Sequence, residues 1–203
     1  MTALEDIRRR HIIDCTIAVL VRDGVAETSL SRIATEAKVA KGIICYYFGS
    51  KEGLYDAVLA SVGERMIAAL VADANAIDDE WRRISAFVGG HLNYARNHRS
   101  ELLALRHLSS TRAGGSHMSD HLAIWRDQRA WLVDTLTAGQ HRGTFQAFDP
   151  LAVATAISGA LEGGLLQWAH DETLDLDLYA GQLLDLFERG VCSPAPARQA
   201  LPA

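Results

Sequence analysis

Two lysines and two tyrosines fall close together between residues 41 and 51, and their types and spacing suit binding to phosphate groups. Lys41 lies at the expected start of a short helix, where free backbone N–H groups and the positive end of the helix dipole favour an anion. Tyr46 and Tyr47 can each donate a phenolic hydrogen bond to a phosphate oxygen, and Lys51 follows just beyond the helix. Lys41, Tyr46 and Lys51 therefore predict a surface that positions a sugar-phosphate backbone.

Smaller side chains on the same outward face are suited to reading the edges of bases. Ile43 can meet a thymine methyl group in the major groove, and Ala40 and Cys45 are expected to lie beside it. Gly42 leaves room for the backbone of a nucleic acid. The candidate DNA-binding set is completed by Thr28 and Ser29.

The element that must position these residues is a helix, a tight turn and a second helix within residues 28–51. Thr28 or Ser29 can cap the first helix, which is expected to run to about Ala37. Apolar or small residues occupy the inward positions 33, 34, 37, 39, 44 and 47, and the small Ala34 lets the two helices cross closely. The pattern predicts a DNA-binding helix-turn-helix, with an ordinary helical hairpin in a core as the alternative.

The segment VAKGIICYYFGSKEGLYDAVL, residues 39–59, resembles the recognition helix and the following helix of the TetR family of bacterial repressors. The usual form of that family there is V-S-K-G-x-L-Y-x-Y-F-x-x-K-x-x-L. Within the family, the run at residues 42–51 is most similar to the choline-responsive betaine regulators. The chain departs from the family pattern twice. Lys38 stands where Gly is common, at a cost of about 1 kcal/mol in a left-handed conformation, and Ala40 replaces a Ser that would cap the helix and contact phosphate.

The resemblance implies a three-helix DNA-binding head at residues 1–48, a ligand-binding and dimerisation body at residues 49–192, and a disordered tail at residues 193–203. It implies a homodimer whose last two long helices form a four-helix interface. A small-molecule effector would release this dimer from a palindromic operator, which makes the protein a repressor of transcription. A helical sensor or scaffold that has lost operator binding is the alternative, motivated by Lys38 and Ala40.

Hydrophobic periodicity along the whole chain predicts about nine helices and no strand, and therefore an all-α fold. Asp149-Pro150 is the clearest helix start, because Asp caps a helix and Pro fits its first position. The helix that follows, to about residue 170, is almost entirely apolar and is expected to be buried on every side, which supports dimerisation. Ser50 is expected to cap a long helix that joins head to body. The other helices are expected at residues 4–22, 79–97, 100–110, 119–138 and 175–190.

Composition and charge are consistent with this organisation. The chain of 203 residues has no apolar run of 18 residues and no secretory signal at its start, so a cytoplasmic location without membrane contact is expected. Its three cysteines are odd in number and form no CxxC pair, which fits reduced thiols. The net charge is −5, yet residues 1–51 carry 8 basic against 6 acidic residues, whereas the rest carries 12 against 19. A mildly basic head on an acidic body suits contact with phosphates.

Aromatic side chains and one carboxylate of the body suggest a pocket for a cationic amine. Glu162 falls within the apolar helix, where a buried carboxylate needs a partner. Tryptophan faces attract quaternary ammonium groups and polyamines, although core packing explains the four tryptophans equally well. The residues expected to line this pocket are Phe87, His91, Trp125 and Glu162.

Signatures of other chemistry are weak. His117 and His121 have the spacing of metal ligands on a helix, but no third ligand is evident, so a surface pair is favoured and no metal site is predicted. The sequence contains no P-loop, Rossmann glycine pattern, G-x-S-x-G or HExxH motif. It therefore predicts neither an enzyme nor a cofactor.

Overall fold

The computed structural model describes residues 3–74, 76–111, 118–171 and 173–193, and it describes their side chains except at 71–74, 109–111 and 118–125. Across these ranges the chain forms nine α-helices and no strand, with one isolated β-bridge between Phe145 and Cys192. The predicted all-α fold is confirmed. Most of the segment between the helices predicted at residues 100–110 and 119–138, and most of the predicted tail, fall outside the described residues. None of the described helices is long and apolar enough to cross a membrane.

The helices follow one another along the chain as the periodicity predicted. They are α1 (Ala3–Glu27), α2 (Leu30–Glu36), α3 (Lys41–Phe48), α4 (Lys51–Ala74), α5 (Glu80–Asn97), α6 (Arg99–Thr111), α7 (Met118–Arg142), α8 (Pro150–His170) and α9 (Leu176–Val191). The Asp149 side chain caps α8 by accepting from the N–H of Leu151, and Ser50 accepts from the N–H of Gly53 at 3.0 Å. The first helix was predicted to end at residue 22, but α1 continues to Glu27 with a break at Gly24, which has φ 75° and ψ 169°.

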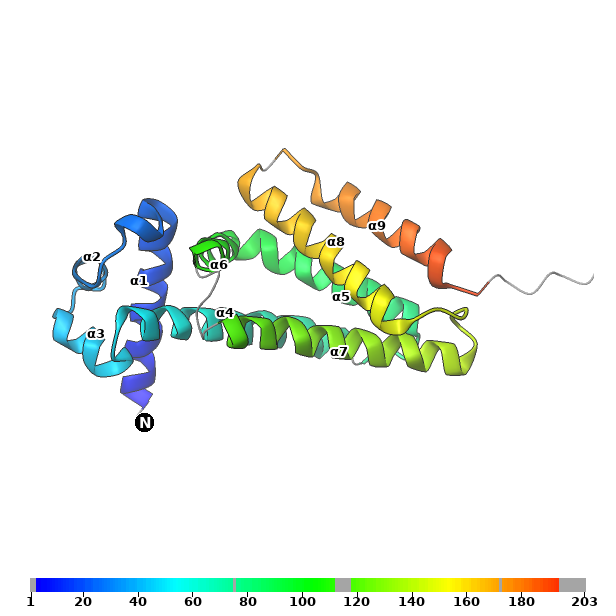
Figure 1. Ribbon diagram of the computed structural model, residues 1–203, viewed down its shortest axis with the longest axis horizontal. Helices are drawn as coiled ribbons and strands as arrows, with labels where there is room; N and C mark the ends of the chain where they lie inside the picture. Colours follow the sequence, from blue (N-terminus) through cyan, green and yellow to red (C-terminus); the bar gives the residue numbers. More distant parts are fainter. Residues whose placement is uncertain (1–2, 75, 112–117, 172, 194–203) are drawn as a thin grey trace, which may run out of the picture.

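The first three helices gather at one end of the molecule, and α4 extends from them into the part of the molecule formed by the later helices (Figure 1). The head core lies between α1, α2, α3 and the start of α4. The body core lies between α5, α7, α8 and α9, and α8 and α9 run side by side (Figure 1). The fully buried side chains of the head core include Ile12, Val19, Ile33, Ile44 and Leu54.

A third cluster of buried side chains joins head to body. Ile17 and Leu20 of α1 pack there with Val58 of α4 and Leu105 of α6. His107 of α6 adds a polar contact, because its Nδ1 donates to the carbonyl oxygen of Leu20 at 3.1 Å. The long helix α4 therefore contributes to the head core at its start and packs against α5 and α7 farther along.

The outer side of α8 and α9 does not follow the prediction of burial on every side. Ile157 and Leu161 of α8 are buried in the body core, as expected. On the other side Leu151 of α8 is 56% exposed, and Leu178 and Leu186 of α9 are 64% and 68% exposed. One chain thus covers only the inner side of α8 and leaves an apolar outer face on the α8 and α9 pair.

Candidate nucleic-acid interface and body cavity

The turn between α2 and α3 has the backbone that the sequence predicted. The Ser29 side chain caps α2 by accepting from the N–H of Arg32 at 3.3 Å. Lys38 has φ 54°, the left-handed conformation expected of a residue that replaces Gly. Ala40 occupies the N-cap position of α3 and provides no side-chain hydrogen bond. The first N–H groups of α3 are therefore free of a side-chain cap and remain open to an anion.

The outward side of α3 carries most of the predicted DNA-binding residues. Ala40, Lys41, Gly42 and Cys45 are exposed, and Tyr46 is 76% exposed. A Cβ atom placed on Gly42 would meet nothing within 4 Å, so open space surrounds this backbone. Because Ile44 points into the head core with no exposed surface, the helix cannot rotate this outward side inward without losing core packing.

Three predicted contact residues lie at the edge of this surface and are only partly exposed. Ile43 and Tyr47 pack against the head core with part of their side chains. Tyr46 and Tyr47 meet edge to face, with ring centroids 5.2 Å apart. The Lys51 ammonium lies 5.4 Å from the centroid of the Tyr55 ring, which orients this cation beside α3.

Thr28 does not belong to the exposed surface. Its side chain is only 1% exposed, and its hydroxyl donates to the carbonyl oxygen of Gly24 at 2.6 Å. The hydroxyl satisfies the backbone where α1 breaks, and Ser29 provides the cap of α2 instead. We therefore remove Thr28 from the candidate interface. The other nine predicted DNA-binding residues remain candidates.

Two side chains of α1 hold the helix-turn-helix through its backbone. The Arg9 guanidinium donates to the carbonyl oxygen of Tyr47 at 2.7 Å and lies 4.6 Å from the centroid of the Phe48 ring. His11 Nε2 donates to the carbonyl oxygen of Ala37 at 3.1 Å. Arg9 thus neutralises the negative end of the α3 dipole while holding the helix against α1. No sequence motif marks these contacts, because they join residues far apart in the chain.

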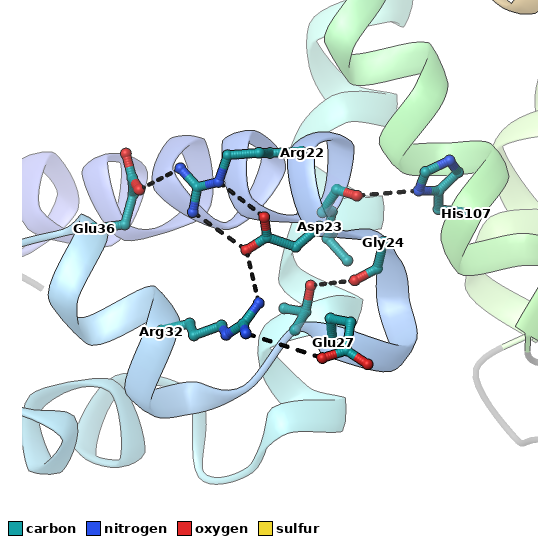
Figure 2. Close-up of polar contacts among 9 residues, drawn as sticks. Arg22, Asp23, Gly24, Glu27, Arg32, Glu36 and His107 are labelled. Atoms are coloured by element: carbon teal, nitrogen blue, oxygen red, sulfur yellow. Dashed lines mark hydrogen bonds and ion pairs between the residues drawn. The ribbon is translucent and has the colours of Figure 1, made fainter.

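A cluster of ion pairs ties α2 to the end of α1 (Figure 2). Arg22 contacts Asp23 at 2.9 Å and Glu36 at 2.8 Å, and Arg32 of α2 contacts Asp23 at 3.2 Å. The hydrogen bond from Arg22 holds the pKa of Asp23 below its ordinary value. These pairs are largely exposed, so their effect is to orient α2 more than to stabilise the fold.

The body contains a cavity of about 190 Å³ between α4, α5 and α7. Its walls combine apolar groups with two polar side chains. Phe87 and Trp131 stack within the wall, with ring centroids 5.1 Å apart and planes 20° apart. The lining residues are Ile67, Leu70, Phe87, Asp127, Gln128 and Trp131.

The four residues predicted for the effector pocket have different places. Phe87 lines the cavity, and His91 lies behind it, 1% exposed, with its ring 4.3 Å from that of Phe87. Glu162 is half-buried on α8 and does not line this cavity, and burial raises the pKa of its carboxyl despite the nearby Arg129. The side chain of Trp125 lies outside the described residues.

The sequence analysis did not assign Gln128 and Trp131 to the pocket. Helical spacing within residues 119–138 left either Gln128 or Arg129 as the inward residue, and it could not show that α4 and α5 cross there. The histidines considered for metal binding, His117 and His121, lie outside the described side chains. Among the described residues, no group of three or more His, Cys, Asp or Glu is arranged to hold a metal ion.

Comparison with known protein sequences gives matches over less than half of the chain. The family model described as bacterial regulatory proteins, tetR family, matches residues 12–58. The transcriptional regulator BetI 2 of Chromohalobacter salexigens is 36% identical over 92 residues, which are 44% of this chain and 44% of that protein. BetI of Klebsiella pneumoniae is 32% identical over 92 residues, 44% of this chain and 47% of that protein. The matched segment thus spans less than half the length of these relatives.

Solved structures match over most of the chain. A transcriptional regulator from Saccharomonospora viridis in complex with choline has a TM-score of 0.82 at 20% identity, covering 93% of this chain and 100% of that chain. FadR from Bacillus subtilis in complex with stearoyl-CoA has a TM-score of 0.79 at 20% identity, covering 87% and 96%. At these identities the likeness shows a shared fold.

Proposed function

We propose, from the premise that the chain belongs to the tetR family of bacterial regulatory proteins, that it is a DNA-binding transcriptional regulator that responds to a small molecule. It acts as a homodimer and represses transcription from a palindromic operator. The effector binds in the body and releases the dimer from DNA.

The observation that carries this proposal is the outward side of α3. Lys41 and Tyr46 offer a cation and a phenolic donor in solvent, while Ile44 on the opposite side is anchored in the head core. Free backbone N–H groups at the start of α3 add a positive potential. A helix of this width fits the major groove, and the exposed Ala40 and Cys45 would then approach base edges.

The apolar outer face of α8 and α9 supports the homodimer. Leu151, Leu178 and Leu186 would be covered by the same face of a second copy, which is how a two-fold interface is built. The exposed Gly159 and Gly163 leave space for close approach of the two helices. Two heads joined in this way can reach successive major grooves when their α3 helices lie about 34 Å apart.

Coupling between effector and DNA is assigned to α4. Ile67 and Leu70 of this helix line the body cavity, and Leu54 of the same helix is buried in the head core. A bound molecule that displaces α4 would change the spacing of the two heads, so that both no longer fit one operator. Two proteins of the same fold were solved with choline and with stearoyl-CoA, which supports a small-molecule effector.

The test is a loss of DNA affinity in a chain that stays folded and dimeric. Duplexes selected by the wild-type chain from a random pool provide the operator, and fluorescence anisotropy measures binding at several salt concentrations. The double variant Lys41→Ala, Tyr46→Phe should bind at least about tenfold more weakly, with a salt slope smaller by about 1. Arg126→Ala, an exposed cation of α7, serves as control and should bind like the wild type.

A second candidate function is a helical sensor that does not bind an operator. The observation that favours it is the N-cap of α3, where Ala40 provides no hydrogen bond. If the selection enriches no duplex and wild-type binding shows no salt dependence, this candidate replaces the first. Ala40→Ser then provides a further check, because it restores the cap and the phosphate contact without altering the core.

A further inference from the structure

One polar side chain in the body cavity is deeply buried and incompletely hydrogen-bonded. Gln128 of α7 is only 6% exposed and lines the cavity beside the apolar Leu70 and Phe87. One end of its amide faces His91 at 3.3 Å, and the other end has no hydrogen-bond partner among the described residues. Buried amide groups are normally paired, so the free end is suited to a group of a bound molecule.

The hydrogen bonds of His91 decide which end of the amide is free. His91 Nδ1 lies 2.9 Å from the carbonyl oxygen of Phe87, which only accepts, so Nδ1 carries a proton. Burial lowers the pKa of His91, which keeps the ring neutral and leaves Nε2 as an acceptor. The end of Gln128 that faces Nε2 must therefore donate.

The amide of Gln128 satisfies this requirement when its NH₂ group points to His91. Gln128 Oε1 lies 3.3 Å from His91 Nε2, which for a neutral ring would bring two acceptors together. A rotation of the amide by 180° exchanges oxygen and nitrogen within the same volume, and the contact becomes an N–H···N hydrogen bond. The carbonyl oxygen then occupies the free end, so the cavity presents an acceptor to its contents.

We propose that the effector is a small organic amine, bound as an ammonium ion that donates an N–H to Gln128 while its apolar part lies against Phe87 and Trp131. The proposal rests on the proposed function and names the chemical class of its effector. It differs from a quaternary ammonium ligand, which has no N–H and would leave the Gln128 carbonyl unpaired. It also differs from a carboxylate ligand, whose oxygens would face an acceptor.

The surroundings of the cavity favour a cation. Asp127 also lines it, with a side chain that is 69% exposed. Its carboxylate adds negative charge at the rim, which Arg126 partly offsets because its Nε lies 3.7 Å from Asp127 Oδ1. The Trp131 ring already attracts a cation of its own chain, since Arg83 Cζ lies 5.9 Å from the ring centroid. The volume of about 190 Å³ equals that of roughly six water molecules, which is enough for a molecule the size of benzylamine.

The first experiment compares three probes of one shape by isothermal titration calorimetry on the full chain without DNA. Benzylamine carries charge and N–H donors, benzyltrimethylammonium carries charge alone, and benzoate carries the opposite charge. We expect benzylamine to bind at least about tenfold more tightly than benzyltrimethylammonium, because a hydrogen bond to a charged group is lost in the latter. Benzoate should bind most weakly.

The second experiment tests the residues. Gln128→Leu should weaken benzylamine binding about tenfold and change benzyltrimethylammonium binding less than about threefold. Asp127→Asn should weaken both cations by about twofold to threefold. Asp134→Asn, the same change at an exposed carboxylate of α7 that does not line the cavity, is the control and should have no effect. If thermal melting shows that Gln128→Leu is unfolded, Gln128→Asn withdraws the carbonyl from the cavity with a smaller change.

Three results would overturn the proposal: no benzylamine binding at millimolar concentration, tighter binding of benzoate, or an unchanged benzylamine affinity in the folded Gln128 variant. The proposed function is tested separately, because operator binding is measured without effector. If the chain binds its operator but is released by benzoate, the proposed function stands and this inference fails. If it binds benzylamine through Gln128 but binds no DNA, the inferred amine site stands and the proposed function fails.

Discussion

The outward side of α3 and the outer face of α8 and α9 are both open to solvent, but they expose different chemistry. α3 presents Lys41 and the phenol of Tyr46, whose polar atoms are well solvated when no partner is bound. α8 and α9 present Leu151, Leu178 and Leu186, whose side chains form no hydrogen bonds with water. A hydrated polyanion suits the first surface, and a second apolar protein surface suits the other. The contrast supports the proposal that the head contacts DNA and that the body forms the contact between two subunits.

The two regions also differ in how their helices are held. The helix-turn-helix is tied to α1 by side chains that donate to backbone carbonyls, Arg9 to Tyr47 in α3 and His11 to Ala37 at the end of α2. α8 is tied to α9 by close packing, because Gly164 lies directly beneath the Tyr179 ring. Steric fit tolerates less change than a polar contact on the surface. Substitutions in the body should therefore have larger effects than those in the turn of the head.

The largest expected effect comes from a charge placed on the outer face of α8. In one chain Gly159 is exposed, and a Cβ there meets nothing within 4 Å, so Gly159→Arg should leave the fold of the protomer intact. In a dimer the arginine would be buried without a partner. We expect monomers by light scattering and operator affinity lower by about a hundredfold or more, because each head then binds its half-site alone.

The matched control for this variant is Gly89→Arg. Gly89 is also exposed and has equally open surroundings, but it lies on α5 and not on α8 or α9. It should remain a dimer with wild-type operator affinity. If Gly159→Arg is still dimeric, the outer face of α8 and α9 is not the dimer interface, and the assignment of assembly to this face fails.

A pair of neighbouring glycines tests how tightly α8 is packed within one chain. A Cβ on Gly164 would lie 2.2 Å from Cε1 of Tyr179, whereas a Cβ on Gly163 would meet nothing within 4 Å. Gly164→Ala should lower the free energy of unfolding by about 1–2 kcal/mol, since overpacking outweighs the gain in helix propensity. Gly163→Ala should raise it by about 0.5–1 kcal/mol. Urea denaturation of both in the Gly159→Arg background excludes any contribution from dimerisation; equal stabilities would refute close packing.

The sequence predicted the head in detail because its information is local. Ile33, Ala34, Ala37 and Ile44 recur at helical spacing around one turn, and all four are buried as predicted. The left-handed conformation of Lys38 was expected from the family resemblance, because glycine is common at this position of the family pattern. Thr28 was wrongly predicted to lie on the exposed surface. A threonine hydroxyl can cap a helix or donate to an earlier carbonyl, and here it donates to the carbonyl of Gly24, where α1 breaks.

The body was predicted only as a set of helices. Helix starts such as Asp149 depend on a few adjacent residues and were found. The cavity depends on how α4, α5 and α7 cross, so Phe87 was found through its inward spacing, whereas the free amide of Gln128 could be seen only in three dimensions. Glu162 was predicted to reach the ligand because a carboxylate in an apolar helix is unusual, but its helix does not line this cavity.

A smaller effect is expected in the turn of the head. Lys38 has φ 54°, which strains a residue with a Cβ but not glycine. Lys38→Gly should therefore raise the free energy of unfolding by about 0.5–1 kcal/mol, the relief of strain being partly offset by the greater entropy of the unfolded chain. Lys38→Ala keeps the strain and should give no gain. If both variants are equally stable, the left-handed conformation at residue 38 costs no free energy, and the turn of the head is not strained.

The two regions should also differ in the pH at which acid lowers their stability. His91 in the body has a pKa held below the ordinary 6.5 by burial, so the unfolded chain binds a proton that the folded chain does not, and stability falls as the pH drops below about 6.5. Asp23 in the head has a pKa held below 3.8 by Arg22, so its contribution is present above that pH and is lost only in stronger acid. Between pH 7.5 and 5 the loss of stability is therefore expected in the body, with a slope of at most about 1.4 kcal/mol per pH unit for one proton.

His91→Leu should reduce the fall in thermal midpoint between pH 7.5 and 5, whereas the exposed His141→Gln should keep it. An unchanged fall in His91→Leu would mean that another group dominates, and it would remove the support that the neutral ring gives to the orientation of Gln128.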